Sequence, residues 1–474
     1  MVLKQKFTSL KKKYIGDKAF YSMVLKVAIP IMIQNGITNL VSLLDNVMVG
    51  TLGTEAMSGV SIVNHFIFVF NLLIFGSVSA ASIYVSQYYG SRDNEGLRYS
   101  FRFKFLITLL CSTLGALIIL IFHTELINLF LHDSESSGDL ALTFSLGKEY
   151  LFVMLIGLIP YAISQVYAST LRETGEVVLP MISSVIAVGT NFVLNLLLIF
   201  GLFGLPALGV IGAAVATVTS RIVELLILII YAHRHTARFE YLKGAFSSLR
   251  IPRRLFKEIT VKGIPLMFNE FLYGLAMTMR NQCYSTRGLD AVAALNISST
   301  VFNLFSVIYM ALGSSVAIIV GSRLGAGLIE EAKDKDRKLI AFSVFTGAML
   351  ALLMAAASLF FPKIYNTTDS VRELASYMII ISGSIMPFAA FSNAAYFTMR
   401  SGGQIFLTIL FDSVYMWAVV MPLSAALAYL TGINIFFLFA ICQMVDIFKS
   451  FFAGFLLRRG TWANALVADE SLKQ

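Results

Sequence analysis

The amino-acid sequence predicts an all-α polytopic membrane protein with twelve transmembrane helices, in two six-helix lobes related by a pseudo-two-fold axis along the membrane normal. Composition, long apolar runs and an internal repeat each support this prediction. Apolar residues make up 57% of the 474 residues and charged residues only 13%. A water-soluble globular protein does not have this composition, so we expect lipid to surround much of the chain.

Twelve apolar runs follow one another along the chain, and each is long enough to cross a bilayer as a helix. A transmembrane β-barrel would show alternating polarity with a turn about every ten residues, whereas these runs are continuous. In chain order the predicted helices cover residues 21–45, 59–86, 101–122, 145–170, 178–201, 208–232, 258–285, 291–320, 339–361, 374–399, 405–430 and 434–457.

The chain repeats itself at an offset of 235 residues. Without a gap, this offset aligns the two copies from Pro30 on Pro265 to Gly90 on Gly325. Further on, residues 171–176 resemble residues 399–404. Repeats of several spans are typical of secondary transporters, whose substrate site lies where the repeats meet. Because each predicted lobe has an even number of spans, both lobes begin on the same side of the membrane.

The repeat also shows where the two copies differ. The same offset places Asp45 opposite Arg280 and Asn35 opposite Glu270. Two similar lobes are therefore expected to carry unlike chemistry at these positions.

Basic residues distinguish the two sides of the membrane. They precede the first span and fill the second, sixth and eighth loops, and Arg172 and Arg400 are assigned to short loops after the fourth and tenth spans. This positive-inside pattern predicts a multi-pass protein of the cell membrane with both termini in the cytoplasm. The net charge of +9 reflects this topology. We expect no nucleic-acid partner, because no basic cluster is interleaved with stacking aromatic residues.

A polar, basic stretch interrupted by Pro252 separates the two halves of the repeat and is interpreted as a linker. The predicted organisation is a cytoplasmic N-terminal segment (1–20), an N-terminal lobe (21–232), the cytoplasmic linker (233–257), a C-terminal lobe (258–457) and a cytoplasmic tail (458–474).

Polar residues follow one face of the first span. Asn35, Asn39 and Ser42 lie three or four residues apart, and Asp45 ends the series. An ionisable side chain in a span costs about 3 kcal/mol and normally faces a cavity or a partner. Asp45 is therefore able to take up a proton or to act as a hard oxygen ligand for sodium. The alternative is a structural aspartate near the outer membrane surface.

Three more polar residues lie in the fifth and sixth spans. Asn191 and Asn195 are one helical turn apart, and Thr217 lies in a run of small residues. Their oxygen atoms could complete an oxygen shell around Asp45. Close helix packing alone is the alternative explanation for the small-residue run.

Glu270 lies next to Asn269 in the seventh span and is the second deep carboxyl group. Such a group is a candidate proton carrier or cation ligand. An ion pair with Arg280, nearly three helical turns away in the same helix, is out of reach, and a partner on another helix stays open. In the last span Asp446 and Lys449, at i and i+3, predict a local ion pair.

The cysteines Cys111, Cys283 and Cys442 are isolated within apolar runs, so we interpret them as small packing residues. A membrane-embedded enzyme would need a clustered nucleophile, base or metal set, and the sequence contains none. We therefore expect no catalytic residue and no cofactor.

Five short motifs occur together along the chain: Ile29-Pro30, Leu44-Asp45-Asn46-Val-Met-Val-Gly-Thr-Leu-Gly, Gln87-Tyr-Tyr-Gly90, Asn191-Phe-Val-Leu-Asn195 and Gly321-Ser-Arg-Leu-Gly325. Over nearly the whole chain, this set resembles the multidrug and toxic compound extrusion (MATE) family of secondary antiporters. The resemblance implies export of bulky cationic or amphipathic compounds, driven by inward flow of sodium ions or protons. The same carboxylates serve either ion, so the choice between them stays open.

By this resemblance Asp45 takes the position of the family's first-span acid, and Glu270 that of the seventh-span glutamate of NorM-type members. Asn195 and Asn393 stand where some members have acids, which puts a second charged cation site in question. The candidate ion-coupling residues are Asp45, Asn191, Asn195, Thr217, Glu270 and Asn393, with sodium at Asp45 or Glu270 if sodium is the ion. The candidate substrate contacts are Asn35, Asn39, Asp45 and Glu270.

A flippase for lipid-linked oligosaccharides or precursors, from the same superfamily, is the main alternative function. Such a protein needs basic residues along its cavity to hold pyrophosphate, and Arg280 favours this alternative. The expected partners are small molecules, the coupling ion and the lipid bilayer, and the expected oligomeric state is a monomer.

Overall fold

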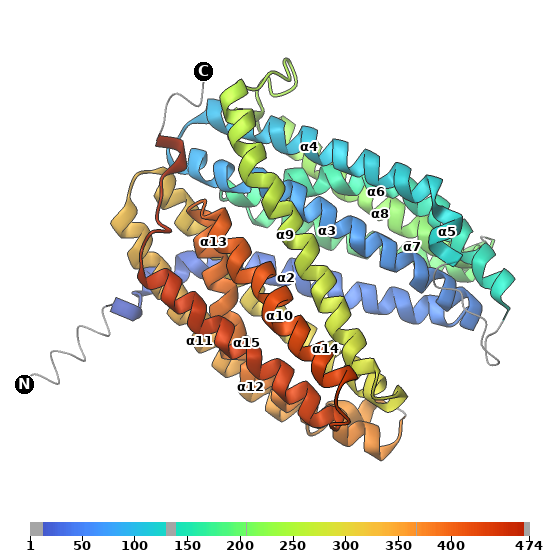
Figure 1. Cartoon of the computed structure of the whole chain (residues 1–474). Coiled ribbons are helices and arrows are strands. Elements are labelled where there is room, and N and C mark those ends of the chain that lie inside the picture. Colours follow the sequence, from blue (N-terminus) through green and yellow to red (C-terminus); the bar gives the residue numbers. More distant parts are fainter. Residues whose placement is uncertain (1–12, 129–138, 205, 366, 469–474) are drawn as a thin grey trace, which may run out of the picture. The chain divides into compact units, whose positions relative to one another are not determined.

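The computed structural model describes residues 13–128, 139–204, 206–365 and 367–468 (Figure 1). These residues form helices joined by short turns. In the first half of the chain the helices are α2 (Lys18–Gly50), α3 (Thr54–Gly90), α4 (Asn94–Ile121), α5 (His123–Asn128), α6 (Leu140–Glu173), α7 (Val178–Phe200) and α8 (Gly209–Arg234). In the second half they are α9 (Arg253–Ser285), α10 (Leu289–Gly325), α11 (Ile329–Ala357), α12 (Asp369–Ser401), α13 (Ile405–Ile409), α14 (Met421–Tyr429) and α15 (Ile435–Arg458).

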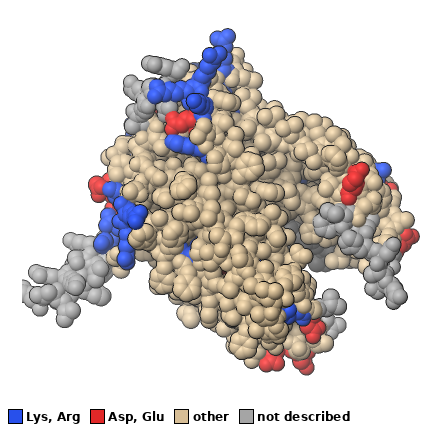
Figure 2. All heavy atoms as spheres, in the orientation of Figure 1, with Lys and Arg blue, Asp and Glu red and all other residues tan. Residues whose placement is uncertain are grey.

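Eleven helical segments among the described residues are long and apolar enough to cross a membrane. One of them, Ile405–Tyr429, contains α13, two π-helical turns and α14. The predicted span 258–285 lies within α9, which has the length of a span but contains several charged residues and is not among the eleven. On the face shown in Figure 2, the charged side chains lie mainly near helix ends, with a broad uncharged area between them. The predicted all-α polytopic membrane fold is confirmed.

The chain forms two compact units. Among the described residues, unit 1 contains 13–32, Ser86–Asp93 and those of 268–468, and unit 2 contains Ile33–Val85 and those of Asn94–Met267. Helices α2, α3 and α9 each contribute residues to both units, because unit boundaries fall inside all three. The sequence instead places the bounds of the lobes and the linker in loops between helices. These bounds stay a prediction.

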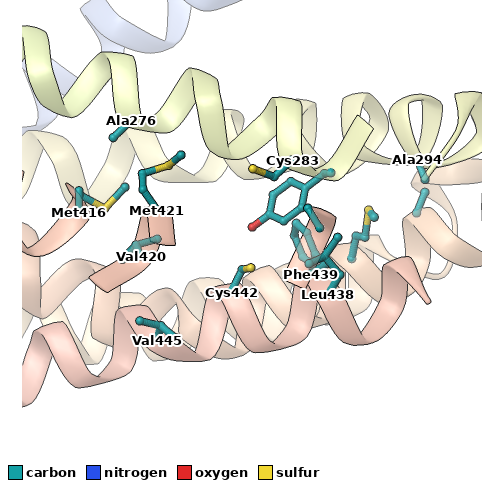
Figure 3. Close-up of a cluster of buried hydrophobic side chains, with 14 of the residues drawn as sticks. Ala276, Cys283, Ala294, Met416, Val420, Met421, Leu438, Phe439, Cys442 and Val445 are labelled. Carbon is teal, nitrogen blue, oxygen red and sulfur yellow. The ribbon is translucent and has the colours of Figure 1, made fainter. Parts of the chain in front are cut away.

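In unit 1 an apolar cluster lies between α9 and α15, where Figure 3 shows side chains of the two helices facing one another. Cys283 of α9 and Cys442 of α15 are buried in this cluster together with Phe439, and both cysteines are free thiols. They act as small packing groups, as the sequence indicated. Lipid tails are as apolar as this cluster, so close van der Waals packing rather than escape from water holds these helices together.

The close approach of the ends of α3 and α10 explains why glycine ends the matched stretch in both copies of the repeat. A Cβ atom on Gly90 would lie 1.8 Å from the backbone oxygen of Ser322, and one on Gly325 would lie 1.9 Å from that of Gln87. Only glycine allows two backbones to approach this closely. All four residues belong to unit 1.

In unit 2, α8 packs against both α6 and α7, and α4 packs against α6. The fully buried Lys104 of α4 pairs with Glu173 of α6 at 2.7 Å. The Arg102 side chain of α4 donates hydrogen bonds to the backbone oxygens of Gly244, Ala245 and Arg250 at 2.7–3.0 Å. The segment before α9 is therefore tied to α4.

Candidate ion-coupling site

Asp45 lies in a polar cluster that joins three helices of unit 2. The Asn195 amide of α7 donates hydrogen bonds to the Asp45 carboxylate of α2 and to the Asn191 side-chain oxygen, the second at 3.2 Å. Asn191 in turn donates to the Thr217 hydroxyl of α8 at 3.2 Å. The cluster therefore brings together the four residues that the sequence analysis proposed for one oxygen shell.

The local sequence explains this arrangement. Asn191 and Asn195 are one turn apart on α7, so both amides point to the same side, and both are almost fully buried. On α8, Gly212 lets the backbone of Leu198 approach, because a Cβ atom there would lie 2.6 Å from the Leu198 oxygen. The small-residue run of α8 thus allows close helix packing, and Thr217 in the same run still contributes its hydroxyl oxygen to the cluster.

One acceptor in this cluster stays unused among the described residues. The Asn195 Oδ1 atom is buried and has no hydrogen-bond partner. A buried acceptor without a donor is costly, and a cation or a protonated group beside it would satisfy it. No basic side chain pairs with Asp45 in the described part of the chain.

The other polar residues predicted for the first span do not join this cluster. Asn35 is partly exposed and Asn39 is exposed, and no hydrogen bond connects either of them to Asp45. The Ser42 side chain lies outside the described side chains.

A second polar cluster in unit 2 was missed by the sequence analysis. Gln34 of α2 donates to Ser184 of α7 at 2.8 Å, and Ser184 donates to the Glu224 carboxylate of α8. Arg172 of α6 donates to the Gln34 side-chain oxygen at 3.1 Å. The sequence predicts a loop position for Arg172, but this residue lies in the last turn of α6, and its side chain reaches across to α2.

In unit 1, Glu270 of α9 has its partners on α12. The Tyr396 hydroxyl donates to the Glu270 carboxylate, and Arg400 Nη1 lies 3.8 Å from the same oxygen. Both charged side chains are largely buried, with exposed fractions of 12% for Glu270 and 7% for Arg400. The assignment of Arg400 to a loop was wrong, because α12 continues through Ser401 and turns this side chain inward.

Tyr396 and Arg400 carried only a weak signal in the sequence. The repeat aligns residues 171–176 with residues 399–404, and this alignment places Arg172 on Arg400. An arginine retained in both copies was the observation that could have identified a buried partner.

A second interhelical group in unit 1 surrounds Asp412. Asn269 of α9 donates to this carboxylate at 3.0 Å, and Lys449 of α15 donates to it at 2.7 Å. Asp412 lies in a π-helical turn, Leu410–Val414, and the next residue, Ser413, donates to Asn269. A π-turn shifts side-chain directions within a helix and is frequent at functional positions.

The predicted local ion pair between Asp446 and Lys449 was wrong. Lys449 binds Asp412, and Asp446 pairs with Arg280 of α9 at 3.0 Å. An ion pair between neighbours three residues apart on one helix stabilises the helix by only about 0.3 kcal/mol. A buried ion pair with a residue of a neighbouring helix is therefore formed in preference to the pair within α15.

Asn393, the remaining candidate, lies on α12 one turn before Tyr396. Its Oδ1 atom is buried without a hydrogen-bond partner among the described residues. It faces Gly313 of α10, where a Cβ atom would lie 2.0 Å from it. No hydrogen bond connects Asn393 to Glu270 in the described structure.

Comparison with known proteins agrees with this architecture. The MatE family model matches residues 30–197 and 265–430. The chain is 24% identical over 414 residues to the probable multidrug resistance protein YoeA of Bacillus subtilis, covering 86% of this chain and 87% of YoeA. It is 27% identical over 409 residues to the probable multidrug resistance protein NorM of Thermotoga maritima, covering 85% and 84%.

A solved structure shares the fold. The outward-facing conformation of a multidrug resistance MATE family transporter of the MOP superfamily superimposes with a TM-score of 0.80 at 18% identity, over 92% of this chain and 96% of that chain. The family model covers most of the chain, in two copies that coincide with the two halves of the repeat. The chain therefore belongs to the MatE family of multidrug-efflux membrane transporters, which are not enzymes.

Proposed function

We propose that the protein is a secondary active antiporter that exports bulky cationic or amphipathic compounds in exchange for sodium ions or protons by alternating access. The observation that carries this proposal is the Asp45 cluster. In the described part of the chain it combines a carboxylate without a basic partner, an unused amide acceptor on Asn195, and a setting of apolar helices.

The chemistry of this cluster suits a monovalent cation. The Asp45 carboxylate and the Asn195 side-chain oxygen are hard ligands of the kind that sodium takes, and Asn191 and Thr217 hold the amides in place. The same carboxylate is equally able to take up a proton. Either ion neutralises Asp45, and neutralisation removes the desolvation cost of a charge among apolar helices.

Glu270 is proposed as the contact for cationic substrates in unit 1. Arg400 already balances its charge, so a substrate cation has to compete with the guanidinium for the carboxylate. Asn35 and Asn39 on α2 are accessible enough to contribute polar substrate contacts in unit 2. Asn393 is proposed as a weaker contributor to coupling, because its unused oxygen lies one turn from Tyr396.

The driving energy follows from the membrane potential. One monovalent cation that crosses with the potential gains about 2.3 kcal/mol per 100 mV. The ion uses this energy only if it binds the two access states with different affinity. We further propose location in the cell membrane with both termini cytoplasmic, in accordance with the distribution of basic residues, and action as a monomer.

The flippase alternative loses its main support. Arg280, the residue that favoured pyrophosphate binding, is largely buried and paired with Asp446. A phosphate would have to break this ion pair before it could bind the guanidinium, which costs several kcal/mol, about 3 kcal/mol or more.

Drug accumulation in inverted membrane vesicles, whose lumen corresponds to the cell exterior, tests the proposal under separately imposed sodium and pH gradients. We expect Asp45→Asn to abolish gradient-driven accumulation of a cationic dye, and Glu270→Gln to weaken dye binding. Asp369→Asn is the matched control, because this carboxylate is 97% exposed at the start of α12. If both variants transport like the control, the proposed roles are wrong. Movement of a labelled lipid-linked sugar in place of dye would support the flippase alternative.

A further inference from the structure

The two units contain hydrogen-bond chains of the same design. In unit 2 the chain runs from Gln34 of α2 through Ser184 of α7 to Glu224 of α8. In unit 1 a chain runs from α9 through the segment Ile405–Tyr429 to α15, and its members are Asn269, Asp412 and Lys449. These helices occupy matching places in the two halves of the repeat.

The gapless offset of 235 residues places Gln34 on Asn269. Because both residues donate to the next helix, their acceptors Ser184 and Asp412 occupy equivalent positions. By the same reasoning Glu224 corresponds to Lys449. The contacts thus align the residues of α8 with those of α15, an alignment that the divergent sequences of these helices do not show clearly.

This alignment identifies a second pair of equivalent positions. Arg221 lies three residues before Glu224, and Asp446 lies three residues before Lys449. The offset of 235 residues places Asp45 on Arg280. In unit 1 the two positions form an ion pair, Arg280 with Asp446, at 3.0 Å. In unit 2 the same two positions carry the opposite charges, Asp45 and Arg221.

The pair is not formed in unit 2. Asp45 accepts from Asn195, and Arg221 lies over the ring of Tyr161 on α6, 4.9 Å from its centre. The Arg221 Nη1 atom is buried and has no hydrogen-bond partner among the described residues. Asp45 and Arg221 are both close enough to the buried Tyr150 hydroxyl of α6 for their charges to act on it. Glu224, one turn along α8, is a charged neighbour of Arg221 on its own helix.

We propose that Arg221 is a tethered counter-charge that competes with the coupling ion for Asp45. When the ion leaves, the guanidinium pairs with the Asp45 carboxylate, as Arg280 pairs with Asp446 in unit 1. When the ion binds, Arg221 returns to the position over Tyr161 that the structure shows. A buried guanidinium without a carboxylate partner is costly, so pairing with Asp45 assists ion release. This inference rests on the proposed function, in which Asp45 binds the coupling ion.

Ion binding to the purified full-length protein tests the competition. Radioactive sodium binding and proton uptake, the latter followed with a pH-indicator dye, identify which ion the wild-type protein binds. We expect Arg221→Gln to bind that ion about tenfold more tightly, because the competing cation is gone, and Arg221→Lys to bind it like wild type. If Asp45→Asn removes binding while Arg221→Gln leaves the affinity unchanged, the counter-charge is refuted. If Asp45→Asn retains full binding, the proposed function of Asp45 fails instead.

A charge exchange tests the geometry without any ion. Asp45→Arg combined with Arg221→Asp reproduces the charges of unit 1 at these positions. We expect the two exchanges to compensate each other. The unfolding equilibrium constant of the double variant should then be at least about tenfold smaller than the sum of the two single effects predicts. Asp45→Arg combined with Ser220→Asp is the control, because the neighbouring position points elsewhere on α8. Simple additivity in both double variants would show that residues 45 and 221 do not reach each other, and would overturn the proposal.

Discussion

The hydrogen-bond chains of unit 2 and unit 1 occupy equivalent positions but differ in charge. In unit 2 the middle residue is the neutral Ser184, and in unit 1 it is Asp412, held by Lys449. The positions of Asp45 and Arg280, which the repeat aligns, also differ. In unit 1 Arg280 forms an ion pair with Asp446, whereas in unit 2 Asp45 accepts a hydrogen bond from the Asn195 amide.

This difference indicates how one repeat serves two purposes. Charges that are paired across helices hold those helices together and are unavailable to an ion. A carboxylate held only by an amide keeps its charge available. We therefore expect substitutions in the Asp412 group of unit 1 to reduce stability more than substitutions in the Gln34–Ser184–Glu224 chain of unit 2, and substitutions around Asp45 to reduce coupling most.

The largest expected effect on stability is that of Lys449→Met in unit 1. It leaves Asp412 buried without a counter-charge, which reduces the free energy of unfolding by about 3–5 kcal/mol. Ser184→Ala, at the position of unit 2 equivalent to Asp412, removes hydrogen bonds of a neutral side chain, so the loss there is about 1 kcal/mol. Unfolding in mixed detergent micelles measures both. Equal losses would contradict the difference between the units.

The glycines that end the matched stretch are expected to behave alike in both copies. Gly90→Ala and Gly325→Ala each place a Cβ atom into a neighbouring backbone and reduce the free energy of unfolding by about 1–3 kcal/mol. Gly36→Ala of α2 is the control, because no atom lies within 4 Å of a Cβ atom there. It is expected to stabilise the helix by about 1 kcal/mol. A loss at only one of the two crossing glycines would show that the contact is not reciprocal.

Arg400→Gln removes the cation that balances Glu270. In alkaline buffer we expect about tenfold tighter binding of tetraphenylphosphonium, measured by calorimetry, because the guanidinium no longer competes for the carboxylate. Arg172→Gln at the repeat-equivalent position should leave binding unchanged, since its partner Gln34 is neutral. Tighter binding in both variants would point to a general effect of net charge.

The smallest expected effect is that of Tyr396→Phe, which removes one hydroxyl donor from Glu270. The loss of one hydrogen bond to a charged group changes substrate affinity about tenfold or less. Tyr377→Phe is the matched control on α12, because its hydroxyl donates to the exposed Glu373. Identical dye affinities of the two variants would exclude Tyr396 from the substrate contact.

Some of the candidate site followed from the sequence. Asp45, Asn191, Asn195 and Thr217 were proposed as one group, and they lie in one hydrogen-bonded cluster. Helical spacing and the resemblance to known transporters were sufficient there, because each residue is polar in an otherwise apolar helix.

The partners of Glu270 and Lys449 did not follow. Arg400 was assigned to a loop because its charge ended the apolar run, although α12 continues one turn further. Lys449 was paired with Asp446 because spacing along one helix is visible in a sequence, whereas the neighbouring Asp412 is 37 positions away.

The sequence by itself determined that the protein lies in a lipid bilayer, that it is helical and that it contains a repeat. Apolar run length and a constant offset are properties of the chain alone. The tertiary structure decided which charges meet. Those contacts depend on the rotation of each helix about its axis and on the register between helices, and packing of many small contacts sets both. For this reason the repeat showed that Asp45 and Arg280 differ, and only the folded protein showed that Arg280 has its carboxylate while Asp45 has no basic partner among the described residues.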